Sequence, residues 1–587
     1  MTLLGCHLRQ LNQRDVTDQP DAYPAPLTPA GVAALVPCSH GNGCPLGVDV
    51  PAIANALLEG DHPRAYLLAR GPNPFASVCG HGCHAPCESG CRRRHYGAPV
   101  AAAALEAYAS AFSVPSLMPS PGPCTSSHDA RSVRGLVGAG VAEGEHPPAS
   151  GKRIAIIGAG PAGLGCAHDL ALLGHECHVF EISQQPGGLM TSALPSFRFP
   201  LASARAECDA LLSLAIVFRA GTPAGGERSL RRLLDEGFDA IFVAIGASAA
   251  GMSPLLDAAR HPCIVDAMDV LAGRRESALR VVVAGDGDLA VDAARVALRR
   301  AREKDGRDAC VSLVLSSTSE EAREPAHMLA GALADGVEIY HGCRVLTIRN
   351  DEGSEQLSAV VIGRADGEDN RVLACEQLLL AGPRIAPVAP FAHELAIESG
   401  AFIATDPETL QTSMRRVWAG GACAFGHRSI AHAVADGKRA AWQIHAELLG
   451  RRVGVRLSAA WIEADDWEAA RTPRALALSR RTLAVLDHTP ADPFADGAHP
   501  AFDDALHEAQ RCFDCATLPV VDASCTSCGK CVPACPVGAL SIGNGGVPAL
   551  LLDQDLCNRC GACVTACPTG ALAMARGVWE ERLRYVS

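Results

Sequence analysis

Eight cysteines near the end of the chain form two runs whose spacing suits iron chemistry. Each run reads Cys-x2-Cys-x2-Cys-x3-Cys-Pro, and the runs start at Cys525 and Cys557. Three closely spaced thiolates can hold one [4Fe-4S] cluster, while the fourth cysteine of such a run binds the other cluster. The spacing therefore predicts two clusters with crossed ligands. The predicted ligand sets are Cys525, Cys528, Cys531 and Cys567, and Cys557, Cys560, Cys563 and Cys535.

The alternative for these runs is a pair of structural zinc sites, which also use Cys-x2-Cys. The repeat itself, the Pro after each run and the matching tails Val-Gly-Ala-Leu and Thr-Gly-Ala-Leu favour clusters. Gly529 and Gly561 ease the tight loops that must wrap each cube. Residues 520–570 resemble a bacterial two-cluster ferredoxin, and this resemblance implies one-electron transfer.

The composition is that of a folded chain with several domains. The chain is 48% hydrophobic and 20% charged, as in folded proteins, and its 587 residues are enough for three or four domains with full-sized cores. The 26 cysteines crowd at 38–91 and 512–567, which favours metal binding over a disulfide framework. No run of eighteen apolar residues and no apolar leader is seen, so we expect a cytoplasmic protein. The net charge of −13 argues against a nucleic-acid partner.

A second group of six cysteines lies in the N-terminal region. Between its two halves, residues 49–70 have the apolar periodicity of a pair of amphipathic helices, which would fold the halves back onto each other. A zinc-stapled or simply cysteine-rich helical cap is the plainer alternative. The six residues are Cys38, Cys44, Cys79, Cys83, Cys87 and Cys91.

This region resembles the N-terminal iron–sulfur domain of the glutamate synthase small subunit and of dihydropyrimidine dehydrogenase. The resemblance rests on Cys44-Pro45, Asn73-Pro74, Cys79-Gly80, Cys83 and Cys87-Glu88-x2-Cys91. It implies one cluster held by Cys44, Cys83, Cys87 and, on the next helix, Glu106. Cys79 is then left over, and we expect it to be a packed thiol.

The same resemblance implies a second N-terminal cluster, for which two ligands are missing from the expected place. The family has an Arg-Cys-x2-Cys pair upstream, but only Cys6 precedes Cys38 here. A matching pair, Arg511-Cys512-x2-Cys515, stands just before the ferredoxin-like runs. We hypothesise a cluster held by Cys38, Cys91, Cys512 and Cys515. The alternative is that only one N-terminal cluster forms.

A complete dinucleotide-binding motif opens the central part of the chain. An apolar strand at 153–157 leads into Gly158-x-Gly160-Pro161-Ala162-Gly163, then a helix through residue 173 and a second strand that ends at Glu181. The glycines allow a tight turn and close approach of the backbone to a pyrophosphate, which sits at the helix N-terminus. Glu181 is placed to bind the ribose hydroxyls. The residues alone predict only an adenine dinucleotide.

Three further segments resemble the FAD site of the same flavoprotein family. They are Gly187-Gly188-Leu189 with the following Pro-Ser-Phe-Arg198-Phe-Pro, the strand at 238–247 that ends near Gly246, and the closing segment 417–441. The resemblance implies that the first motif binds FAD. The closing segment carries Gly421 but has Ala422 where the family has an Asp that contacts FAD, so we expect somewhat weaker binding. A backbone N–H at the following helix start could still hold phosphate.

A second motif, Gly285-x-Gly287-x2-Ala290, resembles the nicotinamide-binding insert of the family, with Asp292 and Arg295 retained. After its second strand, Ser316 and Ser317 replace the Arg pair that clamps the 2′-phosphate of NADPH, and no acid marks an NAD site. Arg323 could supply one cation. The coenzyme is NADP or NAD, with a slight preference for NADP from the family alone. A domain that no longer binds coenzyme is the alternative.

The remaining segments carry no recognisable catalytic constellation. Residues 464–490 have a helical, amphipathic pattern, and 112–150 are rich in Pro, Ser and Gly, as in a linker. His427 and His432 lie in the segment that closes the FAD site. Either could neighbour the flavin, although a packing or surface role is the more ordinary one for histidine.

The sequence thus predicts an α/β flavoprotein with two dinucleotide-binding domains: a Rossmann-like FAD domain with an inserted NAD(P) domain. A helical Fe-S domain precedes it and an α+β ferredoxin-like 2[4Fe-4S] domain follows. The expected ranges are the helical Fe-S domain (1–111), linker (112–150), FAD domain (151–250 and 385–450), NAD(P) domain (251–384), helical bridge (451–519) and ferredoxin domain (520–587).

The function expected from these parts is electron transfer between NAD(P)H and a protein partner, by way of FAD and the clusters. The partner would be a ferredoxin or a low-potential enzyme of the 2-oxoacid:ferredoxin oxidoreductase or acyl-CoA reductase type, in a hetero-oligomer. One alternative is a glutamate synthase small subunit. Another is a non-enzymatic cluster-bearing adaptor, which the changes at Ala422, Ser316 and Ser317 would fit.

Overall fold

The computed structural model describes most of the chain between residues 44 and 449 and shorter stretches outside this range. The described residues are 25–26, 44–89, 91, 93, 98–111, 149–198, 201–214, 216–225, 228–250, 261–305, 309–319, 326–351, 354, 356–364, 370–399, 401–449, 452–463, 502–512, 517–521, 524–536, 538–543, 550–552, 557 and 561–586. They belong to two compact units: one of 1–35, 459–473 and 515–579, and a larger one of 36–458, 474–514 and 580–587.

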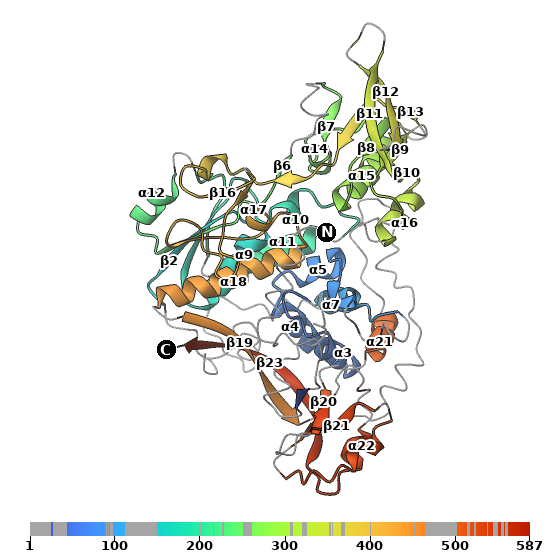
Figure 1. Ribbon diagram of the computed structural model, residues 1–587. Helices are drawn as coiled ribbons and strands as arrows, with labels where there is room; N and C mark the ends of the chain where they lie inside the picture. Colours follow the sequence, from blue (N-terminus) through green and yellow to red (C-terminus); the bar gives the residue numbers. More distant parts are fainter. Residues whose placement is uncertain are drawn as a thin grey trace. The chain divides into compact units, whose positions relative to one another are not determined.

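A five-stranded parallel sheet, in the order β18-β5-β2-β3-β4, forms the first dinucleotide-binding domain of the larger unit (Figure 1). The strand residues alternate between two cores, as the period of two along a strand requires. Ile154 and Ile156 pack with helices α9 and α18, whereas Ala155 and Ile157 belong to the core on the other face. Helix α18 lies along α9, and Gly437 permits this, since a Cβ there would lie 2.0 Å from the Ala162 carbonyl oxygen.

The elements of this domain come from two segments of the chain. The first supplies β2 (Arg153–Ile157), α9 (Pro161–Leu172), β3 (Glu176–Phe180), α10 (Leu189–Ser192), α11 (Leu201–Leu212), β4 (Ile216–Arg219), α12 (Leu230–Asp235), β5 (Ala240–Val243) and β6 (Ala249–Ala250). The second supplies β15 (Arg384–Ile385), η3 (Ala389–Phe391), β16 (Ile397–Glu398), β17 (Phe402–Ile403), β18 (Val417–Ala419), α17 (Ala422–Phe425) and α18 (Ile430–Leu448).

The second dinucleotide-binding domain is inserted between β6 and β15, which pair antiparallel and carry the chain into and out of it. Its parallel sheet has the order β10-β9-β8-β14-β7, and an antiparallel sheet, β11-β12-β13, packs on one face of it. The elements are β7 (Ile264–Asp266), α14 (Ala267–Leu271), β8 (Arg280–Ala284), α15 (Asp288–Asp305), β9 (Cys310–Val314), α16 (Ala326–Asp335), β10 (Glu338–Tyr340), β11 (Cys343–Asn350), β12 (Leu357–Arg364), β13 (Arg371–Ala374) and β14 (Gln377–Leu380).

The N-terminal part of the larger unit is helical. Asp49 and Asp61 start the first two helices by accepting hydrogen bonds from the backbone N–H of Ala52 and Arg64, at 2.9 and 3.0 Å. This confirms the helix pair predicted at 49–70. A distant helix, α21, packs against α3 and α7 and completes the bundle. The helices are α3 (Val50–Leu58), α4 (His62–Arg70), α5 (Ala76–Gly82), α6 (Pro86–Ser89), α7 (Ala102–Ala111) and α21 (Phe502–Gln510).

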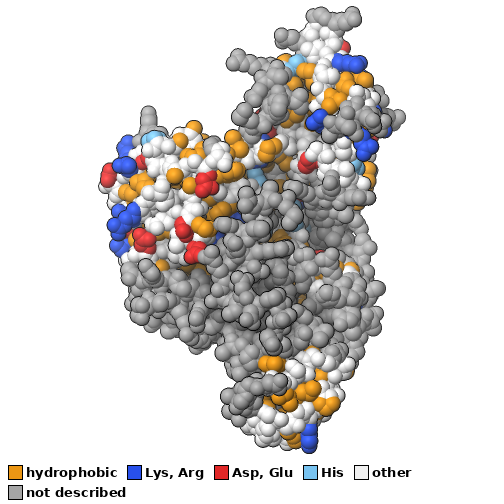
Figure 2. Space-filling model, in the orientation of Figure 1, with side chains coloured by type: hydrophobic (Ala, Val, Ile, Leu, Met, Phe, Trp, Pro, Cys, Tyr) orange, Lys and Arg blue, Asp and Glu red, His pale blue; other side chains and the backbone are white. Residues whose placement is uncertain are grey.

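The smaller unit has a mixed α and β structure. Strands β21 and β22 pair antiparallel, and β20 pairs with residues 572–576 of β23. On the face drawn in Figure 2, hydrophobic side chains, a class that includes cysteine, gather over the described part of this unit. Its elements are β1 (Ala25–Pro26), β20 (Thr517–Val521), α22 (Cys531–Ala534), β21 (Leu540–Ile542), β22 (Leu550–Leu552), α23 (Ala562–Thr565) and β23 (Leu572–Val586), the last of which runs on beyond the unit.

The predicted fold class is confirmed, but two parts of the chain differ from the expected assignment. Strand β1 pairs with β22, so residues 25–26 belong with the ferredoxin-like unit and not with the helical domain. Residues 452–463 form the strand β19 (Arg452–Glu463) where a helical bridge was expected. The sequence there alternates Val453, Val455 and Leu457 with other residues, which is the period of a strand and not of a helix.

Two predicted segments lie outside the described residues. They are nearly all of the linker, 112–148, and the amphipathic segment 464–490. Among the residues that are described, no helix is both long and apolar enough to cross a membrane.

Candidate functional site

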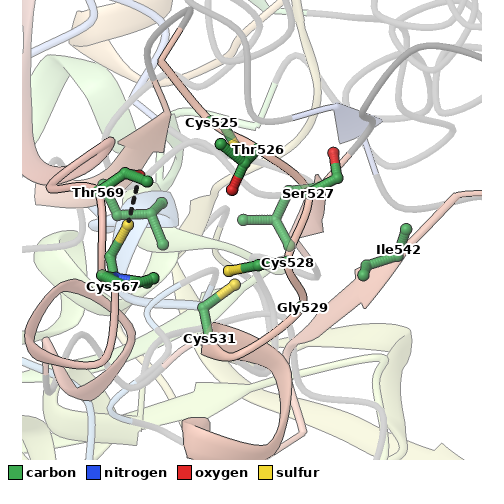
Figure 3. A pocket seen from close by; sticks show the side chains of 12 residues that line it. Cys525, Thr526, Ser527, Cys528, Gly529, Cys531, Ile542, Cys567 and Thr569 are labelled. Atoms are coloured by element: carbon green, nitrogen blue, oxygen red, sulfur yellow. Dashed lines mark hydrogen bonds between the residues drawn. The ribbon is translucent and has the colours of Figure 1, made fainter.

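Four of the predicted cluster ligands line one cavity in the smaller unit. Cys525 and Cys528 come from the loop before α22, Cys531 is the first residue of that helix, and Cys567 comes from the turn after α23. Figure 3 shows the sulfur atoms of Cys528 and Cys531 pointing toward one another, with the Cys528 sulfur directed to the side where Cys567 lies. The other three cysteines all contribute to raising the pKa of the Cys531 thiol, although its burial is the larger cause. The structure therefore brings the crossed ligand set together.

The backbone around this cavity is shaped for a tight loop. Ser527, Gly529 and Gly561 have positive φ values of 55°, 70° and 69°. Cys567 is partly exposed, and its pKa is lowered chiefly by a hydrogen bond with Thr569, whose Oγ1 lies 3.6 Å from the sulfur. Iron binds the thiolate, so a lowered thiol pKa favours the form of Cys567 that a cluster requires.

The second predicted set of the ferredoxin-like unit is described in part. Cys535, Cys557 and Cys563 belong to a single core cluster, and the backbone N–H of Ala539 donates to the Cys535 sulfur at 3.2 Å. The fourth member, Cys560, lies outside the described residues. The ligand assignments of both sets stay predictions.

The predicted N-terminal ligands Cys44, Cys83, Cys87 and Glu106 also lie close together. Burial, with a smaller contribution from Glu106, raises the pKa of the Cys44 thiol to about 11 and that of the Cys83 thiol to about 12. The pKa of Cys87 is raised by burial, then by the charges of Cys44 and Cys83. Thiols so placed favour the protonated state until a cation stabilises the thiolate, which is the usual coupling of metal binding to proton release.

Glu106 itself is held in position by the fold. Its carboxylate accepts a hydrogen bond of 2.7 Å from the Asn73 side-chain amide, and burial raises its pKa to about 8. Cys79 is fully enclosed nearby, and burial is the largest cause of its raised pKa, followed by Glu106 and Cys83. Among the described residues, no three side chains converge as ligands of a single metal ion.

The hypothesis of a cluster shared by both ends of the chain gains a structural basis. The Arg511 guanidinium, fully buried, donates to the carbonyl oxygens of Pro99 and Ala98, at 3.0 and 2.5 Å. The N–H of Ala101 donates to Glu508 at 2.7 Å. Cys512 is buried in the same core against which Cys91 packs. Cys38 and Cys515 lie outside the described residues, so the full ligand set stays a prediction.

The first glycine loop, 158–163, has the geometry that a dinucleotide needs. Gly158 has φ +102°, and a Cβ on Gly163 would lie 1.9 Å from the Gly158 carbonyl oxygen. Neither position accepts another residue without moving the backbone. Gly160 has open space around its Cα and forms the N-cap of α9, which begins at Pro161 and buries Ala162. Pro is suited to the first turn of a helix because its missing N–H would have no partner there.

Glu181 follows β3 and reaches back to this loop. Its carboxylate accepts hydrogen bonds from the N–H of Ala159 at 2.7 Å and of Ser183 at 2.8 Å, and the residue is 7% exposed. It thus fixes the loop against the end of β3, which is the place predicted for the ribose. Its role as a ribose ligand stays a prediction.

The next three predicted FAD-binding residues, Gly188, Leu189 and Arg198, do not all lie at the first glycine loop. Gly188 lies against the first loop, since a Cβ there would be 3.0 Å from the Gly160 Cα, and Leu189 begins α10. Arg198 instead reaches the second domain, where it donates to Asp292 at 2.8 Å and to Asp288 at 3.4 Å. This side chain therefore ties the two dinucleotide-binding domains together.

The closing segment is held by a carboxylate that sequence reasoning missed. The N–H of Gly421 donates to Asp436 at 3.2 Å, and Arg428 also pairs with Asp436, which is 2% exposed. Gly421 has φ +70°, and a Cβ there would lie 2.8 Å from that of Ala162. Ala422 begins the four-residue helix α17, and Gly246 lies in open space with φ +72°. The sequence offered one sign of this role, since Asp436 is an acid on the largely apolar face of the helix at 430–448.

The two histidines of this segment are engaged by the fold. His427 bonds to the Ala247 carbonyl oxygen at 3.0 Å, and burial lowers its pKa. His432 bonds to the Ser429 hydroxyl at 2.7 Å, and burial lowers its pKa to about 4. These contacts suit the packing role.

The second glycine loop is closed by another carboxylate that the sequence analysis did not single out. Gly285 has φ +144°, and a Cβ there would lie 2.1 Å from the Ala381 carbonyl oxygen, whereas Gly287 has open space. Between them, Asp286 accepts hydrogen bonds from the N–H of Ser316 at 2.8 Å and of Ser317 at 3.3 Å. Ala290 is buried under the loop. Arg323 lies outside the described residues.

Comparison with known proteins finds a matching family for each of these regions. The pyridine nucleotide-disulphide oxidoreductase family matches residues 152–437. Dihydropyrimidine dehydrogenase domain II, with its 4Fe-4S cluster, matches 35–115, and the 4Fe-4S dicluster domain matches 524–571. These matches confirm the expected cofactor set of [4Fe-4S] clusters, FAD and a nicotinamide coenzyme.

Three curated proteins illustrate the similarity. The beta subunit of the NADP(+)-dependent formate dehydrogenase of Moorella thermoacetica is 30% identical over 448 residues, which cover 72% of this chain and 61% of that protein. The NAD-dependent dihydropyrimidine dehydrogenase subunit PreT of Salmonella typhimurium is 25% identical over 421 residues, 70% of this chain and 90% of that one. The Escherichia coli glutamate synthase [NADPH] small chain is 28% identical over 327 residues, 50% and 68%. The chain thus spans less than two thirds of the formate dehydrogenase subunit.

Proposed function

Since the chain is an iron–sulfur flavoprotein of the glutamate synthase small-chain and dihydropyrimidine dehydrogenase type, fused to a dicluster ferredoxin domain, we propose that it transfers electrons between a nicotinamide coenzyme and a partner protein. FAD, when bound, exchanges a hydride with the coenzyme and single electrons with the clusters. The similar proteins are named as subunits, so we infer that this chain also works in a hetero-oligomer. The partner is a ferredoxin or a low-potential enzyme.

The observation that carries this proposal is a pair of hydrogen bonds that connects the helix bearing N-terminal thiols to the first dinucleotide-binding domain. Glu207 on α11 accepts hydrogen bonds from the N–H of Ser77 at 2.7 Å and of Val78 at 3.4 Å. These two residues directly precede Cys79 on α5, and Cys83 is the next residue after that helix. Because Glu207 is 7% exposed, its two hydrogen bonds are shielded from water, and this shielding strengthens them.

A second polar contact, next to Cys83, connects the same helical region to the inserted domain. His84, next to Cys83, lies 2.5 Å from the Asp288 carboxylate at the start of α15. Asp288 also receives Arg198 from the segment that follows α10. The bonds from Asp288, Arg198 and His84 fix the coenzyme-binding helix relative to both the FAD segment and the cluster-bearing loop, so a short electron path needs no large rearrangement of the domains.

Within this scheme each predicted residue has a binding or positioning role. The two glycine loops hold the pyrophosphates of FAD and coenzyme, and Glu181 holds the first loop closed. Cys44, Cys83, Cys87 and Glu106 hold one N-terminal cluster, while Cys91 and Cys512 contribute to another. The two crossed cysteine sets of the ferredoxin domain hold two more, which would pass electrons to the partner.

The experiment is anaerobic electron delivery from the coenzyme to an added bacterial ferredoxin, with the wild type and a Cys83→Ser/Cys87→Ser variant. We expect the variant to lose iron and to deliver electrons at least about 100-fold more slowly, because single-electron transfer depends on the cluster. Its flavin should still be reduced by the coenzyme. The matched control is Cys310→Ser, an exposed thiol on β9, which should behave as the wild type.

Two results would contradict the proposal. One is delivery at the wild-type rate by a variant that has lost the iron of its N-terminal cluster. The other is a bound flavin that neither NADH nor NADPH reduces.

A further inference from the structure

The choice between NADH and NADPH depends on the groups that meet the adenosine ribose, and here these lie at the second glycine loop and the end of β9. In a Rossmann-type fold the ribose sits between the loop after the first strand and the end of the second strand. The corresponding residues are Gly285–Gly287 after β8 and Ser316–Ser317 after β9. An inference about this place rests on the proposed function, since it concerns the coenzyme of that reaction.

Asp286 bridges these two elements. Its Oδ1 accepts hydrogen bonds from the N–H of Ser316 at 2.8 Å and of Ser317 at 3.3 Å, and lies 3.5 Å from the Ser317 hydroxyl. Its Oδ2 accepts from the Ser316 hydroxyl. Both serine amides and both hydroxyls therefore already have an acceptor, and that acceptor belongs to the protein.

The same four donors are those that a 2′-phosphate would need. Backbone N–H groups and serine hydroxyls at a strand end bind phosphate well when they are free to donate, as in other anion-binding turns. To enter here, the phosphate of NADPH would have to displace a carboxylate and then remain close to its negative charge. Both requirements oppose binding, since the donors are lost and like charges repel.

A ribose with a free 2′-hydroxyl meets the opposite situation. The hydroxyl donates a proton, and a carboxylate can accept several hydrogen bonds at once. Asp286 is solvent-exposed, so an incoming ribose can reach it without a change in the core. The carboxylate occupies the position that an acid at the end of the second strand holds in NAD-binding folds, although it comes from the loop.

We propose that Asp286 is the residue that selects the coenzyme, and that the chain uses NADH in preference to NADPH. Asp286 accepts from the 2′-hydroxyl of NADH and excludes the 2′-phosphate of NADPH. Ser316 and Ser317 hold Asp286 in position and do not bind phosphate.

The test uses the full-length flavinated protein under anaerobic conditions. It measures kcat/KM for NADH and NADPH with ferricyanide as acceptor, and the affinities for NAD+ and NADP+ by calorimetry. We expect the wild type to prefer the NAD form by at least about tenfold, which corresponds to little more than one hydrogen bond. Asp286→Asn should reduce this preference at least about tenfold, chiefly by improving NADPH and NADP+.

Two further variants keep the test decisive. Asp286→Gly removes the carboxylate with a residue that tolerates any loop conformation, and it should change the preference in the same direction if the Asn variant folds poorly. Asp351→Asn, an exposed aspartate after β11, makes the same change of charge elsewhere in the domain and should leave the preference as in the wild type.

The outcomes separate this inference from the proposed function. A wild type that prefers NADPH, or Asp286 variants that keep the wild-type preference, would overturn the inference while leaving electron transfer intact. A protein that gives no heat of binding with either coenzyme, and whose flavin neither coenzyme reduces, would overturn the proposed function and this inference together.

Discussion

The two glycine loops are closed by carboxylates that point in opposite directions. In the first domain Glu181 stands at the strand end and accepts from the loop N–H of Ala159. In the second domain Asp286 stands in the loop and accepts from the strand-end N–H of Ser316. Each carboxylate connects the glycine loop of its own domain to the end of the second strand, but Glu181 is 7% exposed and Asp286 faces solvent.

This difference in burial fits two different tasks. A buried carboxylate that holds two amides fixes its loop firmly, as suits a cofactor that stays bound through many turnovers. An exposed one leaves the ribose position open, as suits a coenzyme that must enter and leave. The charge at the exposed position can then choose between coenzymes, because it meets each arriving molecule directly.

The largest expected effect comes from adding one methyl group to the first glycine loop, with the same change in the second loop for comparison. Gly163→Ala places a Cβ 1.9 Å from the Gly158 carbonyl oxygen, so strand β2 and helix α9 must separate. We expect a loss of about 3 kcal/mol or more in the free energy of unfolding, and almost no bound FAD. Gly287→Ala meets open space and should cost only the strain of its φ of +86°, about 1 kcal/mol.

The measurement is the flavin-to-protein ratio together with urea unfolding of both variants. Equal flavin content in the two proteins would mean that the first loop is not the FAD loop. Coenzyme affinity provides the reverse check, since Gly287→Ala should weaken it more than it weakens flavin binding.

A smaller effect is expected from removing each carboxylate. Glu181→Ala leaves the buried N–H of Ala159 and the partly buried N–H of Ser183 without their acceptor, which should cost about 2 kcal/mol of stability. Asp286→Ala should cost less than about 0.5 kcal/mol, because water can bond the exposed Ser316 amide. Urea unfolding of the two variants against the wild type measures the difference. Equal losses would show that burial is not what separates the two carboxylates.

The smallest effect is a response to acid that we expect in the first domain. His175 bonds to His445 at 2.8 Å and to the Ser150 hydroxyl at 2.7 Å, and burial, then the charge of His445, lowers its pKa to about 4. A depressed histidine pKa contributes stability that is complete above the unfolded value of about 6.5 and is lost as the pH falls toward 4. Between pH 6.5 and 5 we expect a loss of about 1.5 kcal/mol through this residue.

Unfolding followed by flavin release at pH 6.5 and pH 5 tests this response. His175→Gln should flatten the pH dependence, while His393→Gln, at an exposed position after η3, should not. An unchanged slope in the His175 variant would show that the pKa of His175 does not differ between the folded and unfolded protein.

What the sequence could predict follows from how local each signal was. The strand at 153–157, the glycine loop and the acid at Glu181 lie within thirty residues, so turn chemistry and periodicity are sufficient to place them. The crossed set of Cys525, Cys528, Cys531 and Cys567 likewise follows from a repeated spacing, and the cavity brings these four residues together.

The features that the sequence did not predict depend on contacts across the chain or on one unexpected side chain. Strand β1 adds to β22 from more than 500 residues away, and no local pattern announces it. Asp286 lies at a position that the motif treats as free, so its contact with Ser316 could be found only from the geometry. A meeting of the Cys512 segment with the N-terminal region was hypothesised from a missing ligand pair, but the hydrogen bonds from Arg511 to the carbonyl oxygens of residues 98 and 99 could be found only from the structure.

The most direct test of the account is an anaerobic titration of the purified protein with NADH, then separately with NADPH, followed at the flavin and iron–sulfur absorbance bands together. The account predicts that NADH bleaches both bands at close to stoichiometric addition, and that NADPH needs a much higher concentration. If dithionite bleaches the clusters while neither coenzyme changes the band of a bound flavin, electrons do not enter through the nicotinamide domain, and the account is contradicted.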